Sequence, residues 1–508
     1  MPSARLSLPR IFLDALAAAL LLASPSTAAD HMLRVCDDVA EPISLDPLKE
    51  FSEKYYTIIQ QIFDSLVRFD PDGRIEPSLA TSWRWIDEQT VEFQLRPGVE
   101  FHNGEPFTAE SVRFSIEKFI DPKTGFPGAG FLSSIEGVEV VDTATVRIKT
   151  KFPDGILIHR LAGLVPIMPP RYIAERGAEY FGKHPVGTGA FRFIEWDHKG
   201  RQIVLEGNKG YWVREAVKFE RLVFKFIPQR EQVDKLLSGE VDIVTELPGT
   251  DTLRIMKSGV AKIVKKESFY TMGSSLNGRT GPLSDRRVRQ ALNFALNKEE
   301  LVRYDLLGNG RPAATLTLEG QPGHDPSLRP YPYDLKRARQ LLKEAGYENG
   351  FRLKALVKVQ GLRTMGIITK QLSRIGVSVD IDTTTDTDAV RDMGKKPWDG
   401  IFAGCPDPIS HSFFIQFIFL SSLSPFSVTG DAVYDRMLGK MVNTINAEEQ
   451  ARLGMELDKY VHDQALSLFT YQRIKTYGVR NGFLFIPSIT GMPYFYLSRP
   501  EEYAAAPR

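Results

Sequence analysis

The stretch from Val91 to Phe119, VEFQLRPGVEFHNGEPFTAESVRFSIEKF, predicts a strand, a turn, a polar loop and a helix in that order. Apolar and polar residues alternate over Val91–Leu95, which is the period of a half-buried strand. Pro97-Gly98 is a turn dipeptide that ends the strand. Thr108 is suited to cap a helix whose apolar stripe is Val112, Ile116 and Phe119. The rest of the chain can be placed around this unit.

His102 is the one side chain in this stretch with acid–base chemistry suited to catalysis. It belongs to the turn His102-Asn103-Gly104. A turn histidine satisfied by local hydrogen bonds fits this position better than a catalytic one, so we expect no reaction centre here.

Length and composition bound the class of protein. At 508 residues the chain exceeds one ordinary core, so two or three domains are expected. It is 43% hydrophobic and 25% charged, and its 64 basic and 63 acidic residues give a net charge of +1. That balance argues against a nucleic-acid partner. The only cysteines, Cys36 and Cys405, are either paired or two buried thiols, and the second is favoured because many residues separate them.

The segment LRPGVEFHNGEPFTAESV resembles the signature of the family 5 extracellular solute-binding proteins, the peptide- and nickel-type receptors of ABC importers. PVGTGAFRFIEW, LEGNKGYW, SGEVDI and PLSDRRVRQALNFALNKEEL also resemble segments of that family. Gly187 and Gly189 in the first of these superficially suggest a phosphate loop. An alternating strand follows them instead of a helix, so we expect turn and close-approach glycines at a domain crossover.

The N-terminus reads as a secretory signal peptide over residues 1–29. Arg5 and Arg10 precede an apolar run, and Ser26–Ala29 offers small residues for cleavage. The run is much shorter than the roughly 20 residues that span a bilayer. We therefore expect export and a periplasmic location.

The resemblance implies an α/β, two-lobed, hinged periplasmic-binding-protein fold of type II with an additional accessory domain. Segment order then divides the chain into a first lobe (30–63, 185–275 and 481–508), an accessory domain (64–184) and a second lobe (276–480). Within these we expect a helix over 54–66, a βα alternation over 334–381, and final strands at 465–471 and 477–480.

In such folds crossover loops line the cleft, here 38–47 and 402–414. The candidate ligand-binding residues in and near these loops are Glu41, Ile43, Ser44, Arg363, Trp398, Phe402, Gly404, Cys405, Asp407 and His411. Several have a plainer interpretation. Cys405 and His411 suggest a metal chelate but fit a structural thiol and a loop histidine better, Trp398 fits the core, and Asp407 fits a turn cap.

Peptide-binding relatives hold the peptide amine with an aspartate before the Asp-Pro turn, whereas Gly400–Pro406 contains no acid. Dipeptide-binding relatives hold the carboxylate with an arginine at a place where this chain has Ala355, with Lys358 and Arg363 nearby. Unmodified dipeptides are therefore expected to bind poorly. A modified peptide, an opine-like amino acid derivative or a nickel or other metal chelate is expected to bind better.

These inferences predict a monomeric receptor that captures a peptide-like or other small solute and delivers it to a membrane permease with its ATPase. No cofactor, structural metal site or catalytic residue is expected, because no metal-ligand spacing or nucleophile motif occurs. A secreted hydrolase on a similar scaffold is the rival from another class.

Overall fold

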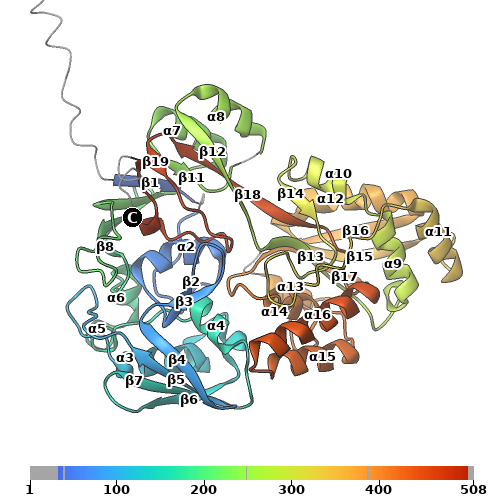
Figure 1. The fold of residues 1–508 in the computed structure, drawn as a ribbon. Coiled ribbons are helices and arrows are strands. Elements are labelled where there is room, and N and C mark those ends of the chain that lie inside the picture. The colour runs from blue at the N-terminus through green and yellow to red at the C-terminus, as the bar shows by residue number, and fades with distance from the viewer. Residues whose placement is uncertain (1–31, 38–39, 248, 386–387, 502–508) are drawn as a thin grey trace, which may run out of the picture.

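The computed structural model describes residues 32–501 except 38–39, 248 and 386–387. It has two lobes, with a third unit attached to the first (Figure 1). The predicted signal peptide lies outside the described residues. The two-lobed, mixed α/β architecture of the predicted type is confirmed.

The first lobe is built on a mixed sheet in the order β12-β18-β11-β1-β10-β9-β8. Parallel β1 and β10 lie at its centre, and helices α2, α7 and α8 pack on it. Its elements are β1 (Met32–Cys36), α2 (Glu53–Ile62), β8 (Phe191–Asp197), β9 (Gln202–Gly207), β10 (Arg221–Lys225), α7 (Gln229–Ser238), β11 (Ile243–Val244), α8 (Thr252–Ser258), β12 (Ala261–Glu267) and β18 (Tyr471–Arg480).

The stretch Val91–Phe119 forms the centre of the attached unit. Its strand is β5 (Thr90–Leu95), in the antiparallel sheet β4-β5-β7-β6, and its helix is α3 (Ala109–Ile120), which packs on β6 and β7. Thr108 is the N-cap as predicted, and its N–H donates to Ser111 Oγ at 3.3 Å. The remaining elements are β2 (Val67–Phe69), β3 (Ile75–Pro77), β4 (Ala80–Asp87), β6 (Ile135–Val140), β7 (Thr145–Thr150), α4 (Leu157–Leu164), α5 (Pro170–Arg176) and α6 (Ala178–Lys183).

The second lobe contains the sheet β13-β17-β15-β16 and its own core of aliphatic side chains. The predicted βα alternation appears as β15 followed by α12 and β16, with β15 parallel to both neighbours. Its elements are β13 (Tyr270–Leu276), α9 (Arg286–Ala295), α10 (Lys298–Tyr304), β14 (Gly310–Pro312), α11 (Leu335–Glu344), β15 (Phe351–Lys358), α12 (Leu362–Leu372), β16 (Val377–Thr384), α13 (Ala389–Met393), β17 (Gly400–Pro406), α14 (Phe413–Leu420), α15 (Ala432–Val442) and α16 (Ala447–Asp463).

Two connections carry the chain between the lobes. The first runs from β12 through Ser268-Phe269 into β13, and the second enters β18 at Tyr471. β18 is one ten-residue strand that pairs with β11 and β12 of the first lobe and with β14 of the second. The prediction of separate strands at 465–471 and 477–480 was wrong, because residues 465–470 lie outside the sheet and the polar residues 472–476 continue the strand from Tyr471 to Arg480.

These strands also differ from two of the predicted domain boundaries. β18 lies within the predicted second lobe but joins the first-lobe sheet, and β13 was assigned to the first lobe but pairs with β17. The remaining domain boundaries stay a prediction.

Helix α2 ends at Ile62, four residues before the predicted end, because the chain turns there to meet the glycine segment. Gly189 N–H donates to Ile62 O at 2.8 Å. A Cβ on Gly187 would lie 2.1 Å from the same carbonyl oxygen. The predicted close-approach role of these glycines is confirmed.

His102 is held by the same segment. Its Nε2 lies 2.9 Å from Gly189 O, and its backbone N–H donates to Gly187 O. The expected hydrogen bonds exist, but they come from residues distant in sequence and not from the turn itself. Burial lowers the pKa of His102 to about 4, so the ring stays neutral and structural.

Gly187→Ala should lower the free energy of unfolding by about 1–3 kcal/mol, because the new methyl group meets backbone that cannot rotate away. Gly366→Ala, in the interior of α12 with no atom within 4 Å, is the matched control and should raise stability by up to about 1 kcal/mol. Equilibrium urea unfolding of both variants checks this. Equal stabilities would contradict the close approach.

Candidate functional site

The two lobes touch through the loop after β17. Ser410 Oγ donates to Gly73 O at 2.7 Å, and His159 Nδ1, on α4, lies 2.9 Å from Ile409 O. Gly163 packs so closely that a Cβ there would lie 2.3 Å from Pro408 O. The Asp-Pro loop therefore lies directly against the unit attached to the first lobe.

Aromatic side chains extend this contact. The Phe131 ring stacks on that of Phe414 with centroids 4.7 Å apart, and Phe51 and Phe417 pack beside them. Arg160 lies over Phe413 and is paired with buried Asp154 at 2.7 Å. Contacts of this kind bury apolar surface only when the lobes are together, so they favour the closed arrangement.

A cavity of about 30 Å³ lies at this junction. Its wall comes from α2, β2, α4 and the chain after β18, with Pro408 contributed by the second lobe. The wall residues are Tyr56, Ile59, Gln60, Phe63, Ser65, Phe69, Ala162, Gly163, Pro166, Pro408, Ser488, Thr490, Met492 and Tyr494. Thirteen of these fourteen wall residues belong to the first lobe and its attached unit, and the cavity has room for about one or two water molecules.

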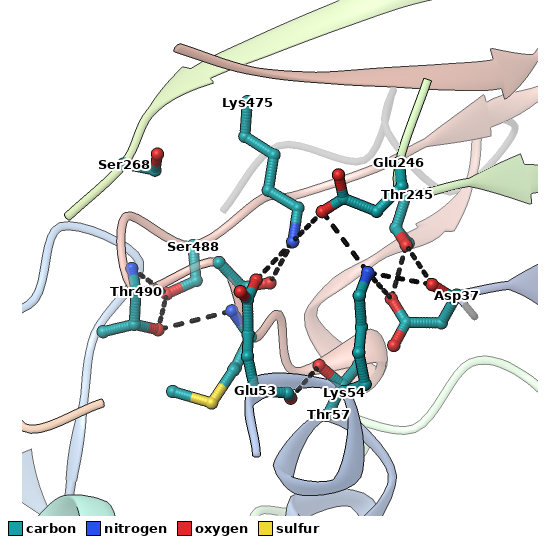
Figure 2. Close-up of polar contacts among 12 residues, drawn as sticks. Asp37, Glu53, Lys54, Thr57, Thr245, Glu246, Ser268, Lys475, Ser488 and Thr490 are labelled. Carbon is teal, nitrogen blue, oxygen red and sulfur yellow. Dashed lines mark hydrogen bonds and ion pairs between the residues drawn. The ribbon is translucent and has the colours of Figure 1, made fainter. Parts of the chain in front are cut away.

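A network of charged side chains stands beside this wall (Figure 2). Lys475 Nζ, on β18, lies 2.6 Å from Glu53 Oε1 and 3.1 Å from Glu246 Oε1, and donates to Gly491 O. Glu246 also pairs with Lys54 at 3.3 Å and with Arg473 at 2.5 Å.

The network fixes the charge state of its members. Although burial alone would raise it, the pKa of Glu246 is held well below 4.5 by Arg473, Lys54 and Lys475. Although burial alone would lower it, the pKa of Lys475 is held well above 10.5 by Glu53 and Glu246. Burial raises the pKa of Asp37, whose Oδ1 accepts from Thr245. Three acids (Asp37, Glu53, Glu246) and three bases (Lys54, Arg473, Lys475) thus offset one another.

Asp407 is fully buried and caps its own turn. It accepts from the N–H groups of Ile409 at 2.9 Å and His411 at 2.7 Å, and from Gln321 Nε2 at 2.6 Å. Burial raises its pKa to about 7. This placement favours the turn-cap interpretation of Asp407 over an amine clamp.

The neighbouring candidates are also internal. His411 Nδ1 accepts from Phe413 N–H at 3.1 Å, and its Nε2 lies 3.4 Å from Gln450 Oε1. Cys405 and Cys36 are both buried and are not joined in a disulfide, as favoured from the sequence. Phe402 belongs to the second-lobe core, and Gly404 lies against Tyr270, whose hydroxyl occupies the space of a side chain.

The remaining candidates lie away from the cavity. Trp398 is buried against Leu356 and Ile401, which favours the core interpretation. Arg363 donates to Tyr304 O at 2.6 Å on α10.

The described part of the first-lobe loop 38–47 contacts β8 and α6. Glu41 Oε2 accepts from Trp196 and His198 on and after β8, Ile43 is 82% exposed, and Ser44 lies against Gly182 of α6. These contacts do not bring it to the 402–414 loop. The ligand role of the ten candidates stays a prediction.

Sequence reasoning missed the residues that do line the cavity from the first lobe. Tyr56 and Gln60 lie on α2, and Ser488, Thr490 and Met492 lie more than 400 residues later. Gln60 and Gln61 both donate to Pro493 O at 3.0 Å, which joins the two segments. No local motif marks such a pairing.

Within the described ranges no helix is both long and apolar enough to cross a bilayer. In the same part of the chain no three His, Cys, Asp or Glu side chains are grouped to hold a metal ion.

Two lobes joined by two connections are the architecture of a two-lobed binding protein. Residues 74–422 match the family described as "Bacterial extracellular solute-binding proteins, family 5 Middle". The chain therefore belongs to the family 5 bacterial extracellular solute-binding proteins, and the predicted resemblance is confirmed.

Named relatives agree with this assignment. The chain is 29% identical over 370 residues to the glutathione-binding protein GsiB of Pectobacterium atrosepticum, which covers 72% of this chain and 71% of the relative. The fold of this chain matches that of the periplasmic binding protein DppA from Helicobacter pylori in complex with the peptide STSA (TM-score 0.78, 23% identity, 92% and 98% of the two chains). It also matches AgaA in complex with agropinic acid from A. tumefaciens R10 (TM-score 0.78, 24% identity, 92% and 98%). At these identities the two structures show the fold.

Lys475→Met should lower the free energy of unfolding by about 3–5 kcal/mol, because it leaves Glu53 and Glu246 buried without their shared cation. Lys459→Met, which removes an exposed pair with Asp463, is the control and should leave the unfolding midpoint nearly unchanged. Denaturant titration measures both.

The same substitution has a defined pH dependence. Because the pKa of Glu246 is lowered in the folded protein, its ion pairs stabilise the fold above pH 4.5, and this stabilisation is lost as the pH falls through the folded-state pKa. Because the pKa of Lys475 is raised, its ion pairs stabilise the fold below pH 10.5, and this stabilisation is lost as the pH rises through the folded-state pKa. The difference between wild type and Lys475→Met should stay constant from about pH 5 to 10 and shrink outside that range. A steady slope across neutral pH would contradict the network.

Proposed function

We propose that the chain is the periplasmic substrate-binding component of an ABC importer, and that it captures a small, peptide-like solute between its lobes. The carrying observation is the fold, in which two lobes are joined by two connections and meet at the loop after β17. Family membership and the names of the relatives support this function.

The mechanism is binding with lobe closure. The connections at Ser268-Phe269 and at the start of β18 are the hinge, because they carry the described chain from one lobe to the other. A ligand held by both walls favours the closed state by its differential affinity. The closed form then docks on a separate membrane permease, whose ATPase powers import.

The proposed ligand class rests on the two positions where peptide-binding relatives hold the peptide amine and carboxylate. Asp407 uses both carboxylate oxygens on Ile409, His411 and Gln321, and Ala355 is buried in β15 where dipeptide-binding relatives have an arginine. Both features support a modified or non-standard peptide-like solute over an unmodified dipeptide. Glutathione is the first solute to test, because it is what the named GsiB relative binds.

Binding of glutathione should raise the melting temperature by mass action and reduce the radius of gyration. At 100 times the dissociation constant the stabilisation is about 2.7 kcal/mol. Calorimetry and small-angle scattering on the same sample measure both effects. Tight binding with unchanged scattering would contradict hinge closure, and a solute panel without any binding would contradict the receptor function.

Export should leave a mature N-terminus near Ala29 or Asp30, because small residues there follow the apolar run. N-terminal sequencing of protein from the periplasmic fraction of its native host checks this. Soluble cytoplasmic protein that retains Met1 would contradict the proposed location.

A further inference from the structure

His411 lies where the second lobe meets the unit attached to the first lobe. It is 1% exposed, and its ring meets that of His159 on α4 edge to face, with centroids 5.0 Å apart. In the same contact Gly155 N–H, from the attached unit, donates to Val442 O of the second lobe at 2.8 Å. The ring is therefore covered by residues from both sides of the contact between the lobes.

The two ring nitrogens of His411 have opposite hydrogen-bonding roles. Gln450 donates through its Nε2 to Met441 O and Thr444 O. Its Oε1 is left as an acceptor, and it lies 3.4 Å from His411 Nε2. On the other side of the ring, His411 Nδ1 accepts from the N–H of Phe413 at 3.1 Å. The proton of the neutral ring is therefore on Nε2, and the lone pair of Nδ1 is already used.

A proton on Nδ1 would be unfavourable for two reasons. It would face the N–H of Phe413, the first residue of α14, so that two donors would meet where a donor now meets an acceptor. It would also add a positive charge close to Arg160, which belongs to the opposite side of the contact and lies over the Phe413 ring. Burial, His159 and Arg160 together lower the pKa of His411 well below its ordinary value.

Helix α14 links this nitrogen to the rest of the contact. It carries Phe414 and Phe417, whose rings pack on Phe131 of the attached unit. When the lobes separate, His159 and Arg160 leave the ring with the attached unit, and water reaches the face that they cover. Protonation of His411 therefore costs more in the closed arrangement than in an open one.

Resting on the proposed lobe closure, we infer that His411 makes this closure sensitive to acid: the closed arrangement needs the neutral ring, and protonation of the ring favours release of the lobes and of the solute between them. The contribution of the ring to closure is complete above an ordinary histidine pKa of about 6.5, and it is lost as the pH falls below that value. From pH 7.5 to pH 5 the ratio of closed to open protein should fall by up to about 30-fold.

Other ionisable groups lie around the ring or on the elements packed against it, and they are His159, Arg160 with its partner Asp154, Asp407, and Asp458 on α16. Burial lowers the pKa of His159 to about 4, so this ring is neutral over the same range. Burial raises the pKa values of Asp407 and Asp458 to about 7. A raised carboxyl pKa favours the buried form in acid, so these two groups act in the direction opposite to His411.

The test is small-angle scattering of the mature chain without added solute at pH 7.5 and pH 5. The wild-type radius of gyration should increase at pH 5, with an unchanged far-ultraviolet circular dichroism spectrum. An unchanged radius would overturn the inference, and so would an increase accompanied by loss of secondary structure.

The key variant is His411→Asn. Its side-chain oxygen can accept from the N–H two residues later, as Nδ1 does, but it cannot take up a proton. This variant should keep the smaller radius at both pH values. It retains Asp407 and Asp458, so expansion of His411→Asn in acid would overturn the role of the histidine. The matched control is His184→Asn, which removes an exposed histidine at the end of α6 and should expand as the wild type does.

A measurement on the wild type keeps the test independent of how His411→Asn folds. Exchange of the histidine C2 hydrogen, followed by mass spectrometry, reports the protonation of each ring separately. His411 should stay neutral to a lower pH than His184 and should become charged over the range in which the radius increases. Titration of His411 together with His184, in protein that remains compact, would overturn the inference.

Calorimetry with glutathione relates the effect to the receptor. The affinity of the wild type should fall by up to about 30-fold between pH 7.5 and pH 5, and this ratio should approach one in His411→Asn. An equal fall in both proteins would overturn the inference and leave the receptor function standing. Failure of a whole solute panel to bind would instead remove the receptor function, while the scattering and exchange measurements, which need no solute, would still decide the role of His411.

Discussion

One ammonium group joins most of the parts that form the site. Lys475 Nζ contacts Glu53 at the start of α2, Glu246 after β11 and the carbonyl of Gly491 near the C-terminus. Its own strand, β18, pairs with strands of both lobes. A buried cation without these acids would be expelled toward water, so the ion network fixes where α2, the sheet and the returning chain can lie relative to one another.

Much of the fold could be predicted from local pattern. Alternation in Val91–Leu95 and the Thr108 cap are properties of neighbouring residues, and the structure has β5 and α3 where they were expected. β18 was missed in part, since Gln472–Thr476 is polar and reads as a loop. Those residues are in the sheet because Arg473 and Lys475 find acids from distant segments, which no window of the sequence reveals.

The site was less accessible to sequence reasoning than the fold. The resemblance pointed to two crossover loops, and it brought one member of the cavity region into view, the Asp-Pro loop with Pro408. It did not point to Tyr56 or Thr490, because their relation exists only through tertiary contacts such as Gln60 with Pro493. Where Glu41 was expected to face the cleft, Trp196 and His198 compete for its carboxylate and hold it on the first lobe.

The pairing of α2 with residues 488–494 also governs when the site can exist. Gln60 and Pro493 are separated by 433 positions, so their contact is among the most non-local in the chain. Closing so long a loop is slow and follows the assembly of local structure. A chain emerging from the ribosome or from a translocation channel lacks one wall of its cavity until residues 488–494 have been released. Ligand recognition is thus a property of the finished molecule, and a partly synthesised or partly exported chain cannot be trapped early in a folded, solute-bound form.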